Sequence, residues 1–290
     1  MKKICVLGCN GMLGSVLTKT LLLNYKIFGI DKYDSKNPKE TDFYCQDLLN
    51  FEKVKTILTR ERPQVIINAA AIVSLEFCEE NYEIAEKLHY RLSEFLTKYC
   101  EENDCKYVYI STDSIFDGNK GNYTEEDLAN PLNSYAKTKY LGDQEAQKNE
   151  NSIVIRTNIY GYSDNQNSLL KWGYNSLKSG RKINGYANVI FNPVSVYQLS
   201  DAINILLEKD FSGVINIGSD RNISKCEFLK FIEKFLKIQK MVEKNEINDD
   251  DSPVKRPKNT TLNINKMSKL FEKNYKSEEG IYDILKEVIV

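Results

Sequence analysis

The sequence predicts an α/β fold: a Rossmann-type doubly wound parallel sheet joined to a smaller mixed α/β substrate-binding lobe. Three features predict it. Short apolar runs alternate with amphipathic stretches through the first half of the chain, as expected of parallel strands covered by helices on both faces. The first apolar run, Lys3–Leu7, leads into a glycine-rich turn that opens a helical pattern. The second run, Lys26–Ile30, is followed at once by an acid, Asp31.

The elements of the first half follow in order along the chain. Strands are predicted for the short runs rich in apolar and β-branched residues, namely Lys3–Leu7, Lys26–Ile30, Val65–Asn68, Tyr107–Ile110 and Ile153–Arg156. Helices are predicted where apolar residues recur every three or four positions, namely Met12–Leu23, Phe51–Arg60, about Glu80–Glu101 and Tyr135–Lys148.

The second half is less regular. Helices are predicted for Ser168–Ser179, after the segment Phe191–Asp201, and for Lys225–Ile238, with a strand at Gly213–Gly218 and a polar stretch at Asn245–Lys258. We therefore expect residues 1–161, with about 192–217, to form a dinucleotide-binding domain. Residues 162–191 and 218–290 are expected to form the substrate-binding lobe.

Composition limits the kinds of partner. The chain has 290 residues and a net charge of −1, so no basic field favours nucleic acid or an anionic membrane. No apolar run is long enough for a signal peptide or a spanning helix. The seven cysteines form no Cys-x-x-Cys motif, and there is one histidine. We expect a cytoplasmic protein with reduced thiols and without a metal site.

The turn after the first strand has the spacing of a pyrophosphate-binding loop. Its glycines would allow a tight turn, close approach of backbone N–H groups to phosphate, and packing of the helix on the strand. The cofactor contacts predicted in this turn are Gly8, Asn10, Gly11, Met12, Leu13 and Gly14. Asp31 would accept hydrogen bonds from the ribose hydroxyls and repel a 2′-phosphate, which favours NAD(H). Lys32 beside it weakens that preference and also allows NADP(H).

Tyr135 and Lys139 share one face of a predicted helix because they are four residues apart. An ammonium beside a phenol stabilises the phenolate and lowers the phenol pKa from its reference near ~10. Such a tyrosine can exchange a proton at neutral pH. An isolated Tyr-x-x-x-Lys also arises by chance in a chain rich in tyrosine and lysine, so the pair needs support from other motifs.

Five motifs occur in order and carry a family resemblance. They are Gly8-x-x-Gly11-x-x-Gly14, Asn68-Ala-Ala-Ala71, Ser111-Thr-Asp-Ser-Ile-Phe-Asp-Gly118, Pro131-Leu-Asn-Ser-Tyr135-Ala-Lys-Thr-Lys139 and Arg156-Thr-Asn-Ile-Tyr-Gly161. With these motifs the chain resembles the extended short-chain dehydrogenase/reductases, and within them the dTDP-4-dehydrorhamnose reductase branch. The resemblance covers nearly the whole chain. It implies reduction of a 4-keto-6-deoxy sugar nucleotide by NAD(P)H in deoxysugar biosynthesis.

The resemblance also implies roles for individual residues. Thr112 would bind the substrate carbonyl, Tyr135 would be the general acid, and Lys139 would bind the nicotinamide ribose and lower the pKa of Tyr135. Asp47 would contact the adenine, with Leu48 beside it in the cofactor site. Ala69, Ala70 and Ala71 would pass beneath the phosphates and the ribose. The sugar nucleotide would be met by Asp113, Ser114, Asn158, Ile159 and, at its phosphates, Arg256. Relatives are dimers or monomers, so a homodimer is one expectation.

Two positions depart from the branch. It usually has Tyr where this chain has Ser114, and Trp near the position of Ile159. Both aromatics help to form the sugar pocket of that branch, so their loss leaves the sugar and the nucleotide base open. His89 lies where relatives often have Asn, and we expect it to face the active-site end of the sheet. Cys9 lies at a helix N-terminus, where thiol pKa values fall, so we expect it to be sensitive to oxidation when the cofactor is absent.

Other functions remain open at this stage. A 4,6-dehydratase usually has Asp and Glu after the threonine, and here Asp113 is followed by Ser114. A sugar-nucleotide 4-epimerase needs only the tyrosine and a tightly held NAD, which this chain could provide. The regulatory subunit of methionine adenosyltransferase resembles the same branch, so a non-catalytic nucleotide-binding subunit is the third alternative.

Overall fold

A seven-stranded parallel sheet forms the centre of the computed structural model, which describes residues 1–34, 41–162, 168–248 and 253–289. The strand order is β11-β6-β5-β4-β1-β2-β3, and all neighbouring strands in it are parallel. The strands are β1 (Lys3–Leu7), β2 (Lys26–Asp31), β3 (Asp42–Cys45), β4 (Val65–Asn68), β5 (Lys106–Ile110), β6 (Ile153–Thr157) and β11 (Gly213–Ile217). The predicted fold class is therefore confirmed.

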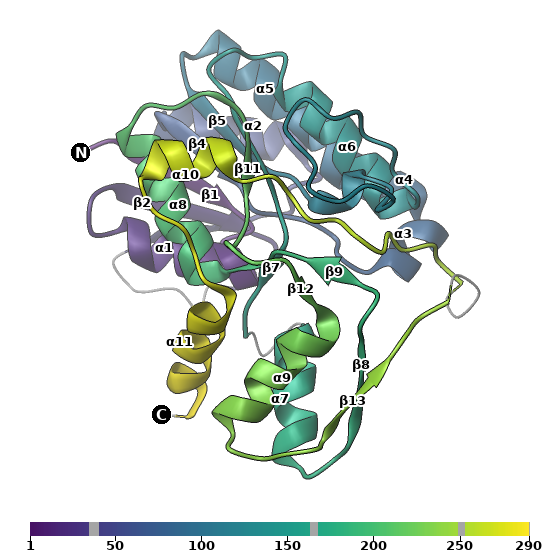
Figure 1. Cartoon of the computed structure of the whole chain (residues 1–290). Coiled ribbons are helices and arrows are strands. Elements are labelled where there is room, and N and C mark those ends of the chain that lie inside the picture. The colour runs from purple at the N-terminus through teal and green to yellow at the C-terminus, as the bar shows by residue number, and fades with distance from the viewer. Residues whose placement is uncertain (35–40, 163–167, 249–252, 290) are drawn as a thin grey trace.

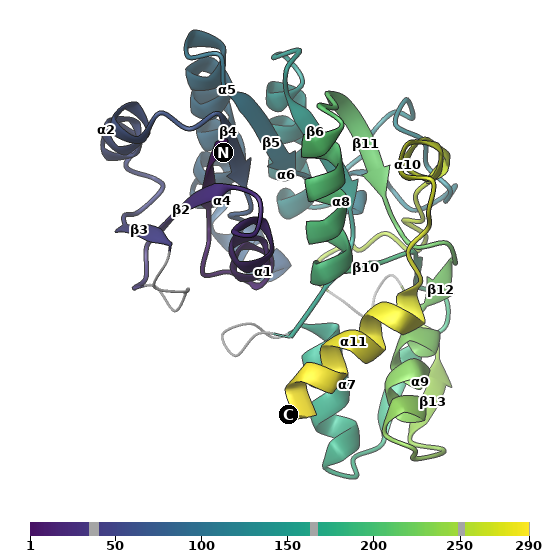
Figure 2. The ribbon, with the colours of Figure 1, turned by 90° about the vertical axis from the view of Figure 1, so that its left-hand side faces the viewer.

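Helices cover both faces of this sheet (Figures 1 and 2). Strand β1 explains the arrangement, because successive side chains of a strand point to opposite faces. Ile4 and Val6 join the core cluster beneath α1 (Met12–Leu21) and α8 (Val196–Glu208). The intervening Cys5 and Leu7 join the second cluster. That cluster lies beneath α2 (Phe51–Glu61), α5 (Leu92–Glu102) and α6 (Ser134–Ala146).

The segment between β4 and β5 is more divided than the sequence predicts. Instead of one long helix it forms α3 (Leu75–Glu80), α4 (Tyr82–Glu86), a π-helical turn at Lys87–Arg91, and then α5. Asn81 separates the first two helices because its backbone leaves the helical region, with φ −130° and ψ 53°. The π turn lies against α6.

The second half supplies the smaller lobe. Helices α7 (Leu169–Lys178) and α9 (Lys225–Phe235) confirm two predicted helices, and Figure 1 shows them beyond the end of the main sheet. Short strand pairs that the sequence did not predict frame them: β8 (Ile183–Tyr186) with β13 (Val242–Asn245), β9 (Ile190–Phe191) with β12 (Ile223–Ser224), and β7 (Ile159–Tyr160) with β10 (Val194–Ser195).

Two further helices follow, α10 (Asn265–Phe271) and α11 (Ser277–Ile289). Helix α10 lies against β11, so the C-terminal segment returns to the main sheet (Figure 1). The division of the chain into two domains stays a prediction. Of the predicted polar stretch, residues 249–252 lie outside the described residues.

Two negative findings apply to the described ranges. No helix within them is long and apolar enough to cross a membrane. No group of three or more His, Cys, Asp or Glu side chains within them could hold a metal ion.

Candidate active site

The predicted site residues lie where the strands of the main sheet end. In a parallel sheet all strands have their carboxyl ends at one edge, and ligands of open α/β folds bind there. The glycine turn follows β1, Asp31 ends β2, Ala69–Ala71 follows β4, Thr112 follows β5 and Asn158 follows β6. The fold thus brings together segments that are far apart in sequence.

The glycine turn has the geometry that a pyrophosphate requires. Gly8 has φ +74°, a conformation that favours glycine. A Cβ on Gly14 would lie 2.1 Å from the Gly8 carbonyl oxygen, so α1 packs too closely on β1 for any side chain there. Helix α1 begins after Gly11 without a side-chain cap. Its first backbone N–H groups, at Met12 and Leu13, can therefore bind an anion.

Asp31 faces this turn. Its Oδ2 accepts the Asn10 N–H at 3.0 Å, and its Oδ1 accepts the Tyr33 N–H at 3.3 Å. The carboxylate is thus fixed beside the loop, as a ribose-binding acid would be. Lys32 is exposed, with its ammonium 5.0 Å from the Tyr33 ring centroid.

The remaining predicted cofactor residues border the same edge. Ala70 packs directly on the turn, because a Cβ on Gly8 would lie 2.9 Å from the Ala70 Cα. Ala69 donates its N–H to the Leu7 carbonyl at 3.1 Å. Asp47 is exposed, whereas Leu48 is 6% exposed and packs in the core. Leu48 could therefore meet an adenine only through its backbone.

Helix α6, which carries Tyr135 and Lys139, is anchored at its start. The Asn133 side chain caps it by accepting the Ala136 N–H at 2.9 Å. Glu79 of α3 accepts both the N–H and the hydroxyl of Ser134, at 2.8 and 2.6 Å. Charged acceptors are favoured at a helix N-terminus, so these contacts fix the turn that carries Tyr135.

The protonation of Tyr135 and Lys139 differs from the sequence prediction. Burial raises the pKa of Tyr135 to about 12, while the Thr112 hydroxyl, within hydrogen-bonding reach of the phenol, lowers it. Burial also lowers the pKa of Lys139 to about 7, with Asp143 opposing the shift. The Lys139 ammonium points to the Ile110 carbonyl at 2.6 Å. Lys139 is not among the groups that shift the Tyr135 pKa, so its predicted lowering of that pKa stays a prediction.

Asp113 is occupied by protein groups. Its side chain is 1% exposed and accepts hydrogen bonds from the hydroxyls of Thr112 and Ser114, at 3.2 and 3.4 Å. The Asn158 amide donates at 3.0 Å and the Thr260 hydroxyl donates a short bond. Burial raises the pKa of Asp113, and these donors oppose the shift. The carboxylate thus links β5, β6 and the C-terminal segment around the site.

Ile159 and Arg256 have different surroundings. Ile159 is half-buried in β7 and packs against the larger core cluster. Arg256 Nη2 lies 2.7 Å from Glu76 Oε1, and both side chains are about half exposed. Their roles toward the sugar nucleotide stay predictions.

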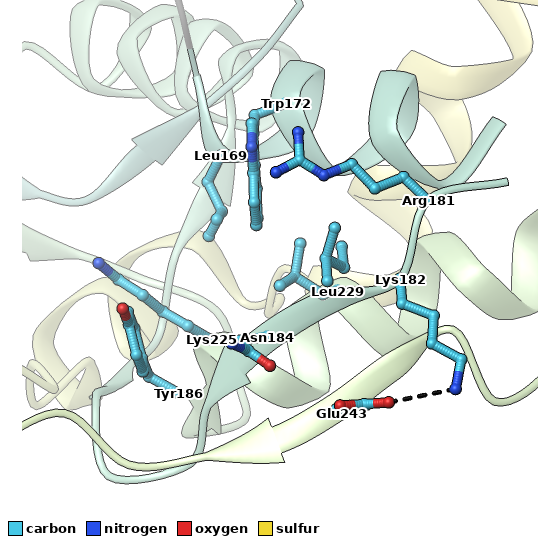
Figure 3. Close-up of a pocket in the computed structure, with 10 residues that line it drawn as sticks. Leu169, Trp172, Arg181, Lys182, Asn184, Tyr186, Lys225, Leu229 and Glu243 are labelled. Carbon is cyan, nitrogen blue, oxygen red and sulfur yellow. Dashed lines mark hydrogen bonds and ion pairs between the residues drawn. The ribbon is translucent and has the colours of Figure 1, made fainter. Parts of the chain in front are cut away.

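A pocket in the smaller lobe adds residues that the sequence did not single out. It has a volume of about 410 Å³ and lies between α7, β8, α9 and β13. This volume falls in the range of ~300–1,000 Å³ usual for ligand sites. Its walls include Leu169, Trp172, Arg181, Tyr186, Lys225 and Leu229. In Figure 3, Lys182 pairs with Glu243 on one side, and Lys225 and Tyr186 lie on the other.

Lys225 lines this pocket and is also close enough to Arg256 and Asp113 to be affected by their charges. Burial lowers its pKa, repulsion by Arg256 adds to the shift, and Asp113 opposes it. Lys225 is also the first residue of α9, where the helix dipole disfavours a cation. Lys225 directly follows the capping Ser224, and the sequence analysis did not consider it as a candidate site residue.

His89 and Cys9 complete the predicted set. His89 is fully buried with its ring 5.8 Å from the Tyr135 ring, so its predicted place at the active-site end is confirmed. The prediction of a reactive Cys9 is wrong. Burial and the nearby Asp31 raise its thiol pKa to about 12, and the side chain is 0% exposed. The effect of a helix N-terminus is outweighed by the loss of solvent.

Known protein families and solved structures include relatives of this chain. A family model described as RmlD substrate binding domain matches residues 1–289. A dTDP-4-dehydrorhamnose reductase of Aggregatibacter actinomycetemcomitans is 26% identical over 93% of this chain and 94% of its own length.

One solved structure and one further relative are also similar to this chain. The crystal structure of a dTDP-4-dehydrorhamnose reductase from Bacillus anthracis, in complex with NADP, is 25% identical with a TM-score of 0.88, and 99% of each chain is covered. Methionine adenosyltransferase 2 subunit beta of Xenopus laevis is 32% identical, over 55% of this chain and 48% of its own length.

Proposed function

This chain belongs to the RmlD substrate-binding domain family within the extended short-chain dehydrogenase/reductases, and from that premise we propose that it reduces the keto group of a nucleotide-linked 4-keto-6-deoxy sugar. One observation carries the proposal. The Thr112 hydroxyl, just after β5, is close enough to the Tyr135 phenol of α6 to lower its pKa, and Lys139 lies one helical turn further along α6. The glycine turn that suits a pyrophosphate lies at the same edge of the sheet.

The residues at this edge fit a nicotinamide dinucleotide. The first N–H groups of α1 would hold its pyrophosphate, Asp31 its adenosine ribose, and Lys139 its second ribose. When bound, the cofactor would supply the hydride. Asp31 favours NAD(H), and the charge of Lys32 also accommodates NADP(H). The solved relative with NADP supports acceptance of the phosphorylated form by the family.

Tyr135 suits the role of proton donor. A phenol with a pKa of about 12 is fully protonated at neutral pH. It can therefore give a proton to the oxygen of a ketone as negative charge develops there. Thr112 would hold the same oxygen from the other side. An epimerase would need the same tyrosine to accept a proton first.

The small-lobe pocket suits the nucleotide end of the substrate. Trp172 and Tyr186 offer aromatic surface for a base. Lys225 and Arg256 repel each other, as the lowered Lys225 pKa reflects, and a diphosphate between them would relieve that repulsion. Ser114 and Ile159 are smaller than the Tyr and Trp usual in the dTDP-4-dehydrorhamnose reductase branch, which would leave room for a sugar other than rhamnose precursors.

The chain has a single tryptophan, so its fluorescence reports this pocket alone. Titration with UDP, dTDP, GDP, CDP and ADP should change the Trp172 emission for the preferred base. Lys225→Met should weaken that binding, while Lys230→Met, an exposed lysine of the same helix, should not. NAD(P)H oxidation with the matching 4-keto-6-deoxy sugar nucleotide then tests turnover. Binding without turnover of any member of a panel would indicate a regulatory subunit instead.

A further inference from the structure

His89 has two hydrogen-bond partners on two different segments. Its Nε2 lies 3.0 Å from the backbone N of Ile72, which follows the cofactor loop Ala69–Ala71. Its Nδ1 lies 2.8 Å from the hydroxyl of Thr138 in α6. The ring is fully buried in the π-helical turn between these segments.

These partners determine which nitrogen carries the proton. A backbone N–H can only donate, so Nε2 must be the unprotonated acceptor. Nδ1 then carries the hydrogen and donates it to Thr138. The Thr138 hydroxyl can pass its own hydrogen to the carbonyl of Ser134 or Tyr135, at 2.9 and 3.0 Å. Each role in this chain of hydrogen bonds is satisfied by a neutral imidazole.

The surroundings oppose a charged imidazole. Burial lowers the pKa of His89 well below its usual range, and Lys139 of α6 adds to the shift. Tyr109 of β5 donates its hydroxyl to the His89 carbonyl at 3.3 Å, and the Tyr135 ring lies edge-on to the imidazole at an interplanar angle of 90°. Burial and Lys139 are the causes of this shift among the described residues, and neither supplies a counter-charge for a proton on Nε2.

We propose that His89 is a positioning residue: a single neutral imidazole sets the spacing between the cofactor loop and the helix turn that carries Tyr135. The proposal rests on the proposed reduction. Thr138 lies between Tyr135 and Lys139 in α6, so a shift of this contact moves both residues together. An asparagine has a shorter side chain and no atom at the position of Nε2, which holds the Ile72 N–H in this structure.

The first test does not depend on turnover. Because the chain has one histidine, its imidazole ¹⁵N signals in an NMR spectrum need no assignment. We expect a protonated Nδ1 and an unprotonated Nε2, with no titration between about pH 5.5 and 8.5, unlike a free histidine near ~6.5. The opposite tautomer, or titration near the free value, would overturn the proposal.

The second test is kinetic. In His89→Asn and in Thr138→Val we expect kcat to fall about 10-fold to 100-fold, with the substrate KM within about threefold, because small misplacements of a reacting group have effects of this size. Thr138→Ser keeps the hydroxyl and should restore most of the rate. The double variant His89→Asn/Thr138→Val should be no slower than the slower single variant, because both substitutions remove the same hydrogen bond between His89 and Thr138.

A matched control separates positioning from stability. Thr97→Val removes another buried hydroxyl that connects α5 to α6, where Thr97 donates to the Glu145 carbonyl at 3.4 Å. It should lower the Tm without changing kcat or the pH at which kcat falls on the basic side. In His89→Asn that pH should move, because the packing around Tyr135 changes.

Failure of the proposed function and failure of this inference are distinguishable. If no sugar nucleotide is turned over, the affinity for NAD(P)H is measured in place of kcat. His89→Asn should weaken this affinity, because the Ala69–Ala71 loop loses a hydrogen bond that supports it. If turnover is measured and His89→Asn stays within about twofold of the wild type in a folded protein, the positioning role is refuted while the reductase remains.

Discussion

Replacing Lys139 by Met should make the protein more stable at acidic pH while it abolishes turnover. Lys139 is 3% exposed, and burial lowers its pKa from the ordinary 10.5 to about 7. A shift of this size corresponds to about 5 kcal/mol, an upper limit for the cost of burying the charge. Met has a similar length and no charge. It leaves the Ile110 carbonyl without its donor, which costs about 1–3 kcal/mol.

The pH dependence gives this prediction its sign. Below pH 7 both the folded and the unfolded chain hold the proton, so the folded state bears the full cost of the buried charge. Between pH 7 and 10.5 only the unfolded chain holds it, so the free energy of unfolding contributed by Lys139 rises with pH. Above that range neither state is charged, and the cost is absent.

We therefore expect Lys139→Met to raise the free energy of unfolding by about 2 kcal/mol at pH 6. This gain should fall as the pH rises above 7, vanish at about pH 8.5 and become a loss by about pH 10, because the Ile110 carbonyl still lacks its donor. Urea unfolding at intervals between these pH values measures both. Lys137→Met, an exposed lysine of the same helix, is the control and should leave the pH dependence unchanged. Parallel wild-type and Lys139→Met curves over the whole range would refute the reasoning.

Three further predictions concern other parts of the molecule. Asp31→Ser should shift the ratio of the kcat/KM values for NADH and NADPH toward NADPH by about tenfold, because NADH loses a hydrogen bond to a charged group. An unchanged ratio would show that other residues determine the cofactor preference. Arg156→Met should lower the free energy of unfolding by about 3–5 kcal/mol, because it leaves the buried Asp143 carboxylate without its ion-pair partner. Asp143 is 0% exposed and its Oδ2 lies 3.0 Å from Arg156 Nε, and chemical denaturation measures the change. A thiol reagent at pH 8 should label only Cys45 quickly, because the other six cysteines, Cys9 among them, are buried. Loss of the fast phase in Cys45→Ser confirms the assignment, and fast labelling of Cys9 would contradict its raised pKa.

The sequence predicted those elements whose signal is local. The alternation of apolar runs and amphipathic stretches gave the main sheet, and β1, α1 and β4 agree with it within a few residues. Strand β3 was missed because its four residues are partly exposed and have no apolar run. The short pairs β8–β13 and β9–β12 were missed because each is formed by segments distant in sequence.

The site was predictable in its residue types and less so in its protonation. The spacing of Tyr135 and Lys139 puts them on one helix face, yet their pKa values depend on burial by other segments. Cys9 shows the same limit. A Cβ on Gly29 of the neighbouring strand would lie 2.4 Å from the Cys9 sulfur, so the thiol is enclosed by a contact that its own segment does not reveal.

The most direct test of the proposed function is the oxidation of NADH or NADPH by the purified protein in the presence of nucleotide-linked 4-keto-6-deoxy sugars, compared with Tyr135→Phe. We expect cofactor oxidation equal to the amount of sugar alcohol formed, and a fall of kcat of about 100-fold or more in the variant, as for loss of a general acid. Equal rates for the wild type and Tyr135→Phe, or no oxidation with any such sugar, would contradict the account.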